Sequence, residues 1–245
     1  MPPANPATNL SAPRERHATP FHSTIPLGAW LLVQIGAISL VALRIPLWPH
    51  APAAGEFLAM DVLLIVQILF AALLSSRLCQ DWRTTVTAIA SAGPFAIFAG
   101  SLAAASSSTI LYAAMYVGGW IVVLRIWNLP FPSKRGRMTV SAVAATWGAA
   151  GPLLLFIGNE FGATPFRSTG TQMRLMLGPI IGALSEIGEN RMESGFMNSG
   201  WAMLAGAAIV GMIVFLLKKA AVSRGLDIRS GGFGAISGRH SKTDT

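Results

Sequence analysis

The chain has 245 residues, of which 53% are hydrophobic and only 11% are charged. A soluble domain carries about a quarter charged residues, so these few charges cannot cover a water-exposed surface. Most of the surface must face an apolar medium, and we expect the lipid bilayer to be that partner. The net charge of +8 would suggest nucleic acid in a soluble protein. Here the position of the charges matters more than their sum, and we expect no nucleic-acid partner.

Six apolar segments are long enough to be membrane spans. They cover about residues 25–48, 57–76, 85–104, 109–127, 139–158 and 200–217. The uncharged stretch 84–124 is about twice as long as the roughly 20 residues that one crossing needs, so we divide it at 106–108. The segments are apolar all round and do not alternate as barrel strands do. A helix satisfies its backbone within one segment, so an all-α, polytopic membrane bundle is predicted.

Basic residues predict the orientation. With both ends in the cytoplasm, only four of the 18 Lys and Arg fall outside, namely Arg44, Arg167, Arg174 and Arg191. This bias is typical of cytoplasmic loops. We therefore expect a multi-pass protein of a bacterial-type inner membrane. Its proline-rich tail 1–24 is expected to be disordered and cytoplasmic. A basic, Gly/Ser-rich cytoplasmic tail is expected at 218–245, and its part 220–245 is expected to be disordered.

Several tryptophans also lie where the ends of the spans are expected. Trp30, Trp82 and Trp127 fall at expected inner ends of spans, whereas Trp120 and Trp147 fall deep within them. Indole rings favour the membrane interface, where the ring is buried and its N–H stays hydrated.

Groups that carry chemistry are sparse. Cys79 is the only cysteine and cannot build a thiolate cluster. The four histidines all lie outside the apolar segments, so no haem ligand is expected at membrane depth. The patterns GxxxxGK[ST] and GxSxG are absent. We expect no catalytic residue, metal site or cofactor, and we do not expect this chain to be an enzyme.

Four polar residues are candidates for contacts inside the membrane. Gln34 and Gln67 lie deep in the first two segments, where side-chain amides hydrogen-bond between helices or line a polar path. Arg44 and Asp61 lie at similar depths near the outer ends of the same segments. They are expected to form an ion pair or to reach the interface separately, and a proton or ion relay is the functional alternative.

The outer loop 159–199 is the longest connection. Its central part, 172–188, contains an uncharged stretch that is too short to cross the membrane. We expect either a re-entrant helix that gates the outer mouth or an interfacial helix that rests on the membrane or the bundle.

This layout resembles the permease subunits of the second ABC exporter class, which include the haem-exporter permease. In that family a short segment of mixed charge follows the second span, and 72–94 looks like it, with Arg77, Asp81 and Arg83 at the charged positions. The loop 159–199 looks like the family's outer segment with short re-entrant helices. The resemblance implies a homodimer and a separate ATPase chain. That chain would dock near Arg77, Asp81 and Arg83 and near a second basic group, Lys134, Arg135 and Arg137.

Three functions remain open. The first is the permease subunit of an ABC-type export system. The second is a non-catalytic structural or assembly subunit of a larger membrane complex, which fits the absence of motifs. The third is a stand-alone carrier or channel, which would need more polar groups at mid-membrane than Gln34 and Gln67.

Overall fold

The computed structural model describes residues 21–42, 58–160, 178–180, 183–184 and 199–223. Six long helices make up most of this part of the chain: α1 (Phe21–Ala42), α2 (Leu58–Leu78), α3 (Trp82–Leu102), α4 (Ser107–Asn128), α5 (Lys134–Glu160) and α8 (Ser199–Ser223). No strand occurs within these described ranges. The prediction of an all-α chain is confirmed for them.

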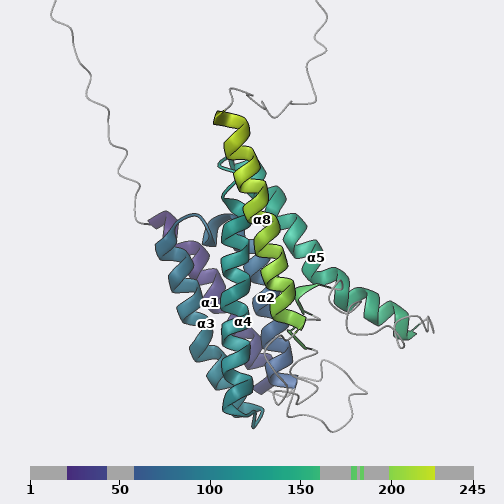
Figure 1. Ribbon diagram of the computed structural model, residues 1–245. Coiled ribbons are helices and arrows are strands. Elements are labelled where there is room, and N and C mark those ends of the chain that lie inside the picture. The colour runs from purple at the N-terminus through teal and green to yellow at the C-terminus, as the bar shows by residue number, and fades with distance from the viewer. Residues whose placement is uncertain (1–20, 43–57, 161–177, 181–182, 185–198, 224–245) are drawn as a thin grey trace, which may run out of the picture.

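Helices α2 and α4 form the centre of the bundle (Figure 1). Helix α2 packs against α1, α3, α4 and α5, and α4 also contacts α3 and α8. Successive helices reverse direction, so α1 begins and α8 ends at the upper end of the bundle in Figure 1. The lower half of α5 diverges from α8 in the same view.

Local capping explains where α3 and α4 begin. The Asp81 side chain accepts a hydrogen bond from the backbone N–H of Thr84, 2.7 Å away, and Ser106 accepts one from Thr109, 3.2 Å away. Each side-chain oxygen satisfies an N–H that has no partner within the helix. The turn 103–106 contains Ala104 in the left-handed region, with φ of 49°. The division that the sequence places at 106–108 falls at this turn.

Four helices are long and apolar enough to cross a membrane: Ala59–Leu78, Trp82–Leu102, Ser107–Asn128 and Gly200–Ser223. Large apolar side chains are exposed along them, among them Ile97 on α3 and Ile213 on α8, which are 59% and 50% exposed. A monomeric soluble protein rarely leaves extended apolar faces of this kind in water. The chain is therefore a multi-pass membrane protein.

Several helices extend beyond the apolar segments on which they are built. Helix α1 begins at Phe21, so the end of the tail 1–24, expected to be disordered, is helical. Helix α8 continues to Ser223, so Lys218 and Lys219 are helical, and so are residues 220–223, where a disordered tail is expected from the sequence. Helix α5 begins at Lys134, within a region interpreted as a connection. Alanine and lysine are good helix formers, and lysine can extend its charged end toward water. A helix therefore need not end where the apolar segment ends.

Candidate functional site

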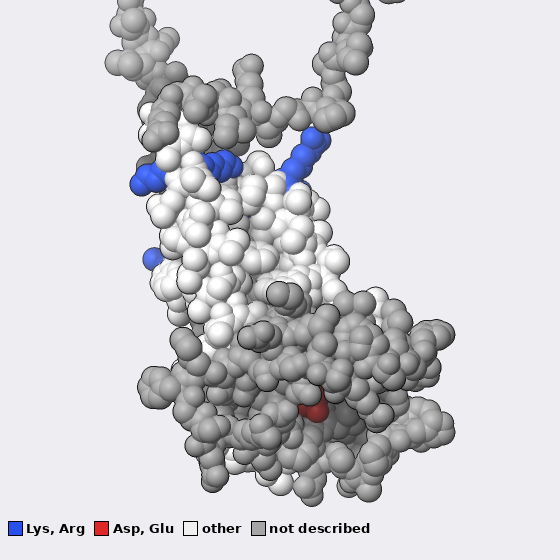
Figure 2. All heavy atoms as spheres, turned by 45° about the vertical axis from the view of Figure 1, so that its right-hand side comes forward, with Lys and Arg blue, Asp and Glu red and all other residues white. Residues whose placement is uncertain are grey.

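Basic side chains gather at one end of the bundle. The Lys and Arg residues that the structure describes are Arg77, Arg83, Arg125, Lys134, Arg135, Arg137, Lys218 and Lys219. All lie at the ends of α2, α4 and α8 or at the beginnings of α3 and α5, which the alternating helices bring to the same end. We call this the basic end. Figure 2 shows the blue side chains in the upper half of one face, with an uncharged white surface beneath them.

The α2–α3 turn at the basic end is short and tightly hydrogen-bonded. Only residues 79–81 separate the two helices. The Thr85 hydroxyl donates to the Leu78 carbonyl at 3.2 Å, and the Arg125 guanidinium donates to the Cys79 carbonyl. The resemblance to exporter permeases predicts a docking segment in this region. In this chain, the connection itself is a three-residue turn.

Asp81 has a structural role in this turn. One carboxylate oxygen accepts from the Thr84 backbone N–H and the other accepts from the Thr84 hydroxyl, both at 2.7 Å. These two hydrogen bonds, the backbone one first, hold the pKa of Asp81 below its usual range. The acidic member of the expected docking group is thus already engaged in capping α3.

The two basic groups of the expected docking surface lie side by side. The Ser141 hydroxyl of α5 is 2.8 Å from that of Ser75 and accepts from the Ser76 N–H at 3.0 Å, which joins the beginning of α5 to the end of α2. Ser76 immediately precedes Arg77 in the sequence, and Ser141 lies about one helical turn after Arg137.

Side chains of this surface differ in their exposure. Arg77, Arg83, Lys134 and Arg135 are exposed, whereas Arg137 is half-buried. The Nε of Arg137 is buried and has no hydrogen-bond partner among the described residues. Four exposed cationic side chains are therefore available for an acidic partner.

In the interior, Gln34 and Gln67 contact one another. The Gln67 amide donates to the Gln34 side-chain oxygen at 2.6 Å, and the Gln34 amide faces the Trp30 carbonyl at 3.4 Å. Both glutamines are at most 1% exposed. This contact joins α1 to α2, as interhelical amide pairs do in membranes.

Arg44 and Asp61 are not placed together by the structure, because Arg44 lies outside the described residues. Asp61 is half-buried in the first turn of α2, where the helix dipole favours a negative charge. The ion pair stays a prediction.

Part of the segment 172–188 packs inside the bundle. The Tyr116 hydroxyl of α4 donates to the Pro179 carbonyl at 2.9 Å, and Ile180 and Ala183 are fully buried. Gly178 has φ of +100°, and a Cβ there would lie 2.5 Å from the carbonyl oxygen of Trp147 on α5. This close approach and this φ both require glycine. Tyr116 and Trp147 lie near the middle of their helices, so the described residues of this segment reach mid-bundle depth.

Trp30 lies inside the bundle: it is fully buried, and its indole N–H donates to the Ser91 hydroxyl of α3 at 2.9 Å. Trp82, in contrast, is 61% exposed at the basic end. No sequence signal pairs Trp30 with Ser91, because the two residues lie on different helices and a hydropathy pattern concerns a single helix.

Two further contacts, which the sequence does not reveal, join tryptophans of α4 to neighbouring helices. The Trp120 indole donates to the Ile68 carbonyl at 3.0 Å, and Trp127 stacks on Trp147 with ring centres 5.7 Å apart. The depth of Trp120 and Trp147 could be read from the sequence, but their partners could not.

Comparison with known proteins gives no family for this arrangement: no family model, no curated protein and no solved structure matches the chain. The function must be inferred from the chemistry and geometry of the chain itself.

Proposed function

We propose that the chain crosses a bacterial-type inner membrane six times, with both ends in the cytoplasm. Helices α1 and α5 contain 22 and 27 residues. At about 1.5 Å per residue, each exceeds the roughly 30 Å of the hydrocarbon layer. The gathering of the described Lys and Arg at one end supports this topology, because cytoplasmic segments are enriched in them.

Within that topology, we propose that the chain is the permease subunit of an ABC-type export system. The observation that carries the proposal is the segment between α5 and α8, of which Pro179 and Ile180 pack at mid-bundle depth between α4 and α5. Exporter permeases, which this layout resembles, have re-entrant helices between their fifth and sixth spans. A re-entrant segment on the outer side is the element that would open or close a path there.

The ATPase would be a separate chain that binds the basic end. Its binding surface on this chain combines the end of α2 with the beginning of α5, which the Ser75–Ser141 contact holds together. Exposed Arg77, Arg83, Lys134 and Arg135 would meet acidic residues of the partner. Opposite charges at the edge of such an interface mainly increase the rate and specificity of association.

A second candidate is a non-catalytic structural or assembly subunit of a membrane complex. Two observations favour it: the α2–α3 connection is only a three-residue turn, and the buried amides of Gln34 and Gln67 bond to each other. Paired amides hold helices together and leave few polar groups for a path.

The test is purification of the full chain, tagged at its C-terminus, in mild detergent from its native host, followed by mass spectrometry of the proteins that accompany it. The permease proposal expects a stoichiometric P-loop ATPase. The double variant Arg77→Gln with Arg135→Gln is expected to lose that ATPase. The control, Arg229→Gln with Arg239→Gln, removes the same charge from the tail 218–245 and is expected to keep it.

The other outcomes are equally informative. Membrane subunits without an ATPase would overturn the permease proposal and support the structural one. A chain recovered alone would contradict both and would direct attention to solute uptake by liposomes that contain only this chain.

A further inference from the structure

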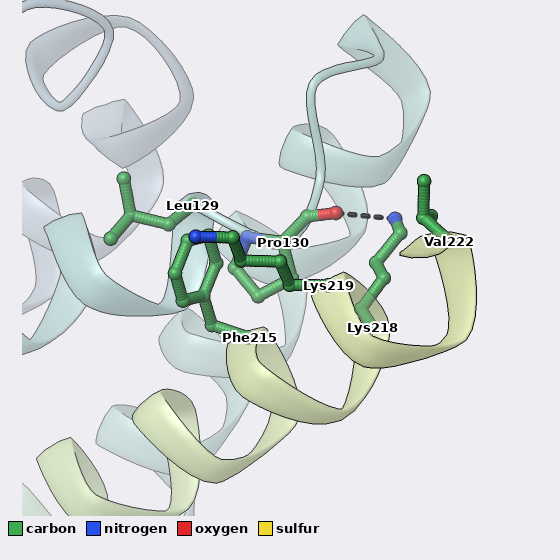
Figure 3. Close-up of a pocket in the computed structure, with 6 residues that line it drawn as sticks. All are labelled: Leu129, Pro130, Phe215, Lys218, Lys219 and Val222. Carbon is green, nitrogen blue, oxygen red and sulfur yellow. Dashed lines mark hydrogen bonds between the residues drawn. The ribbon is translucent and has the colours of Figure 1, made fainter. Parts of the chain in front are cut away.

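A pocket of about 220 Å³ lies at the basic end, between α8 and the connection from α4 to α5. Its lining residues are Leu129, Pro130, Phe215, Lys218, Lys219 and Val222. Apolar side chains thus form most of the lining, and its only charged side chains are those of Lys218 and Lys219, which are consecutive on α8 (Figure 3).

Lys218 is held in place on one side of this pocket. Its ammonium group donates a hydrogen bond to the Pro130 carbonyl and lies 5.0 Å from the centre of the Phe131 ring. The carbonyl and the ring both favour the cation. An ammonium group has three N–H donors, so donors remain for a ligand.

Lys219 approaches the pocket from the other side. Figure 3 shows its side chain running across Pro130 toward Leu129, while Lys218 faces the Pro130 carbonyl. Within the described part of the chain, Lys219 has no hydrogen-bond or ion-pair partner. No acidic residue lines the pocket, so the two positive charges are not neutralised there.

The depth of the pocket indicates what kind of molecule fills it. Ile213, Leu216 and Leu217, which precede the lysines on α8, are at least half exposed, as side chains facing acyl chains are. Lys218 and Lys219 follow directly, where the apolar part of a crossing helix ends. The pocket therefore lies at the level where acyl chains meet head groups, and a ligand there can be charged at one end and apolar at the other.

We propose that this pocket binds an anionic phospholipid, with the head-group phosphate at Lys218 and Lys219 and an acyl chain resting on Phe215. Basic pockets between membrane helices recognise anionic head groups, and each Lys near the surface contributes about 1 kcal/mol. A zwitterionic lipid would bring its own cationic amine close to two ammonium groups and would bind less well. This site does not depend on the proposed transport function and requires only that α8 lies in the membrane.

The test uses the full-length chain purified in detergent, mixed with equal amounts of phosphatidylglycerol and phosphatidylcholine, and examined by native mass spectrometry. The wild type is expected to retain one phosphatidylglycerol in preference to phosphatidylcholine. Lys219→Gln is expected to weaken that retention about 5-fold, and Lys218→Gln with Lys219→Gln roughly 25-fold. The charge-matched control, Arg229→Gln with Arg239→Gln, is expected to retain the lipid as the wild type does.

Lys219→Gln keeps the test decisive even if the double variant fails to fold, because Lys219 has no partner among the described residues to lose. Equal retention of the two lipids by the wild type, or unchanged retention by Lys219→Gln, would overturn the proposal. Displacement of phosphatidylglycerol by millimolar inorganic phosphate would also overturn it, since the site would then be one for a soluble anion. An ATPase is absent from this experiment, so its outcome is separate from that of the proposed function.

Discussion

Cys79 lies in the α2–α3 turn, yet it is buried. Its thiol faces the Ile121 carbonyl at a distance of 3.8 Å, and its own carbonyl accepts from Arg125. Burial raises the pKa of the Cys79 thiol to about 12, and the positive charge of Arg125 offsets only part of that effect. The nucleophilic form of cysteine is the thiolate, so this thiol is unreactive while the turn is folded.

We predict that Cys79 resists N-ethylmaleimide at pH 8 in mild detergent and reacts once the chain is unfolded in SDS. Because the folded pKa lies above the unfolded value of 9.0, the thiol's contribution to stability is fully present below pH 9. That contribution is lost as the pH rises from about 9 to 12. Mass spectrometry of the modified chain follows the labelling, and unfolding in SDS at pH 8 and at pH 10.5 follows the stability.

A cysteine at the neighbouring exposed position provides the control for that experiment. Gln80→Cys, made together with Cys79→Ser, is expected to react readily in the folded protein, since residue 80 is exposed. If Cys79 reacted as fast as the Gln80→Cys thiol, the turn would be open and its hydrogen bonds would not form.

At the scale of helices, α4 and α8 approach closely because glycines stand at their contact. A Cβ added at Gly211 would lie 2.5 Å from Cδ1 of Trp127, and one at Gly119 would lie 3.2 Å from Leu204 and Trp201. Trp127 cannot easily give way, because its indole donates to the Ala207 carbonyl at 2.8 Å and its ring stacks on Trp147. Small residues permit this kind of contact between membrane helices.

We predict that Gly211→Ala destabilises the bundle by about 1–3 kcal/mol, the usual range for an overpacked contact. Gly206 lies on the same helix, but a Cβ there meets no atom within 4 Å. Gly206→Ala is therefore expected to be neutral or slightly stabilising, because alanine is the better helix former. Loss of helical circular dichroism with increasing SDS measures both variants, and equal effects at the two positions would show that the α4–α8 contact is not tight.

For the whole molecule, the distribution of charge predicts the direction of insertion. The described Lys and Arg lie at the end where α1 begins and α8 ends, and the turn 103–106 lies at the opposite end. Cytoplasmic segments carry the excess of basic residues, so the basic end should face the cytoplasm.

We predict that alkaline phosphatase fused after Thr245 is inactive and that a fluorescent protein at the same position is bright. Phosphatase fused after Ala104, in the α3–α4 turn, is expected to be active, because this enzyme matures only outside the cytoplasm. The two fusion sites serve as controls for each other, because each reporter is expected to be active at one site and inactive at the other. An active phosphatase after Thr245 would reverse the proposed orientation and place the lipid pocket in the outer leaflet.

Much of the architecture followed from local properties of the sequence. The helical class, the position of the α3–α4 turn and the clustering of basic residues at helix ends depend on hydropathy, capping residues and charge, which act over a few residues. The same local patterns identified Gln34 and Gln67 as buried polar residues and marked 172–188 as unusual.

Only the tertiary structure decided which distant groups meet. It paired Gln67 with Gln34, buried Trp30 against Ser91 and packed Pro179 against Tyr116. It also brought Lys218 of α8 to the carbonyl of Pro130. These contacts depend on how separate helices approach and rotate toward one another. Side-chain packing across the whole bundle determines this relative position and rotation of the helices. Hydropathy along one segment determines only that the segment can form a helix in the membrane.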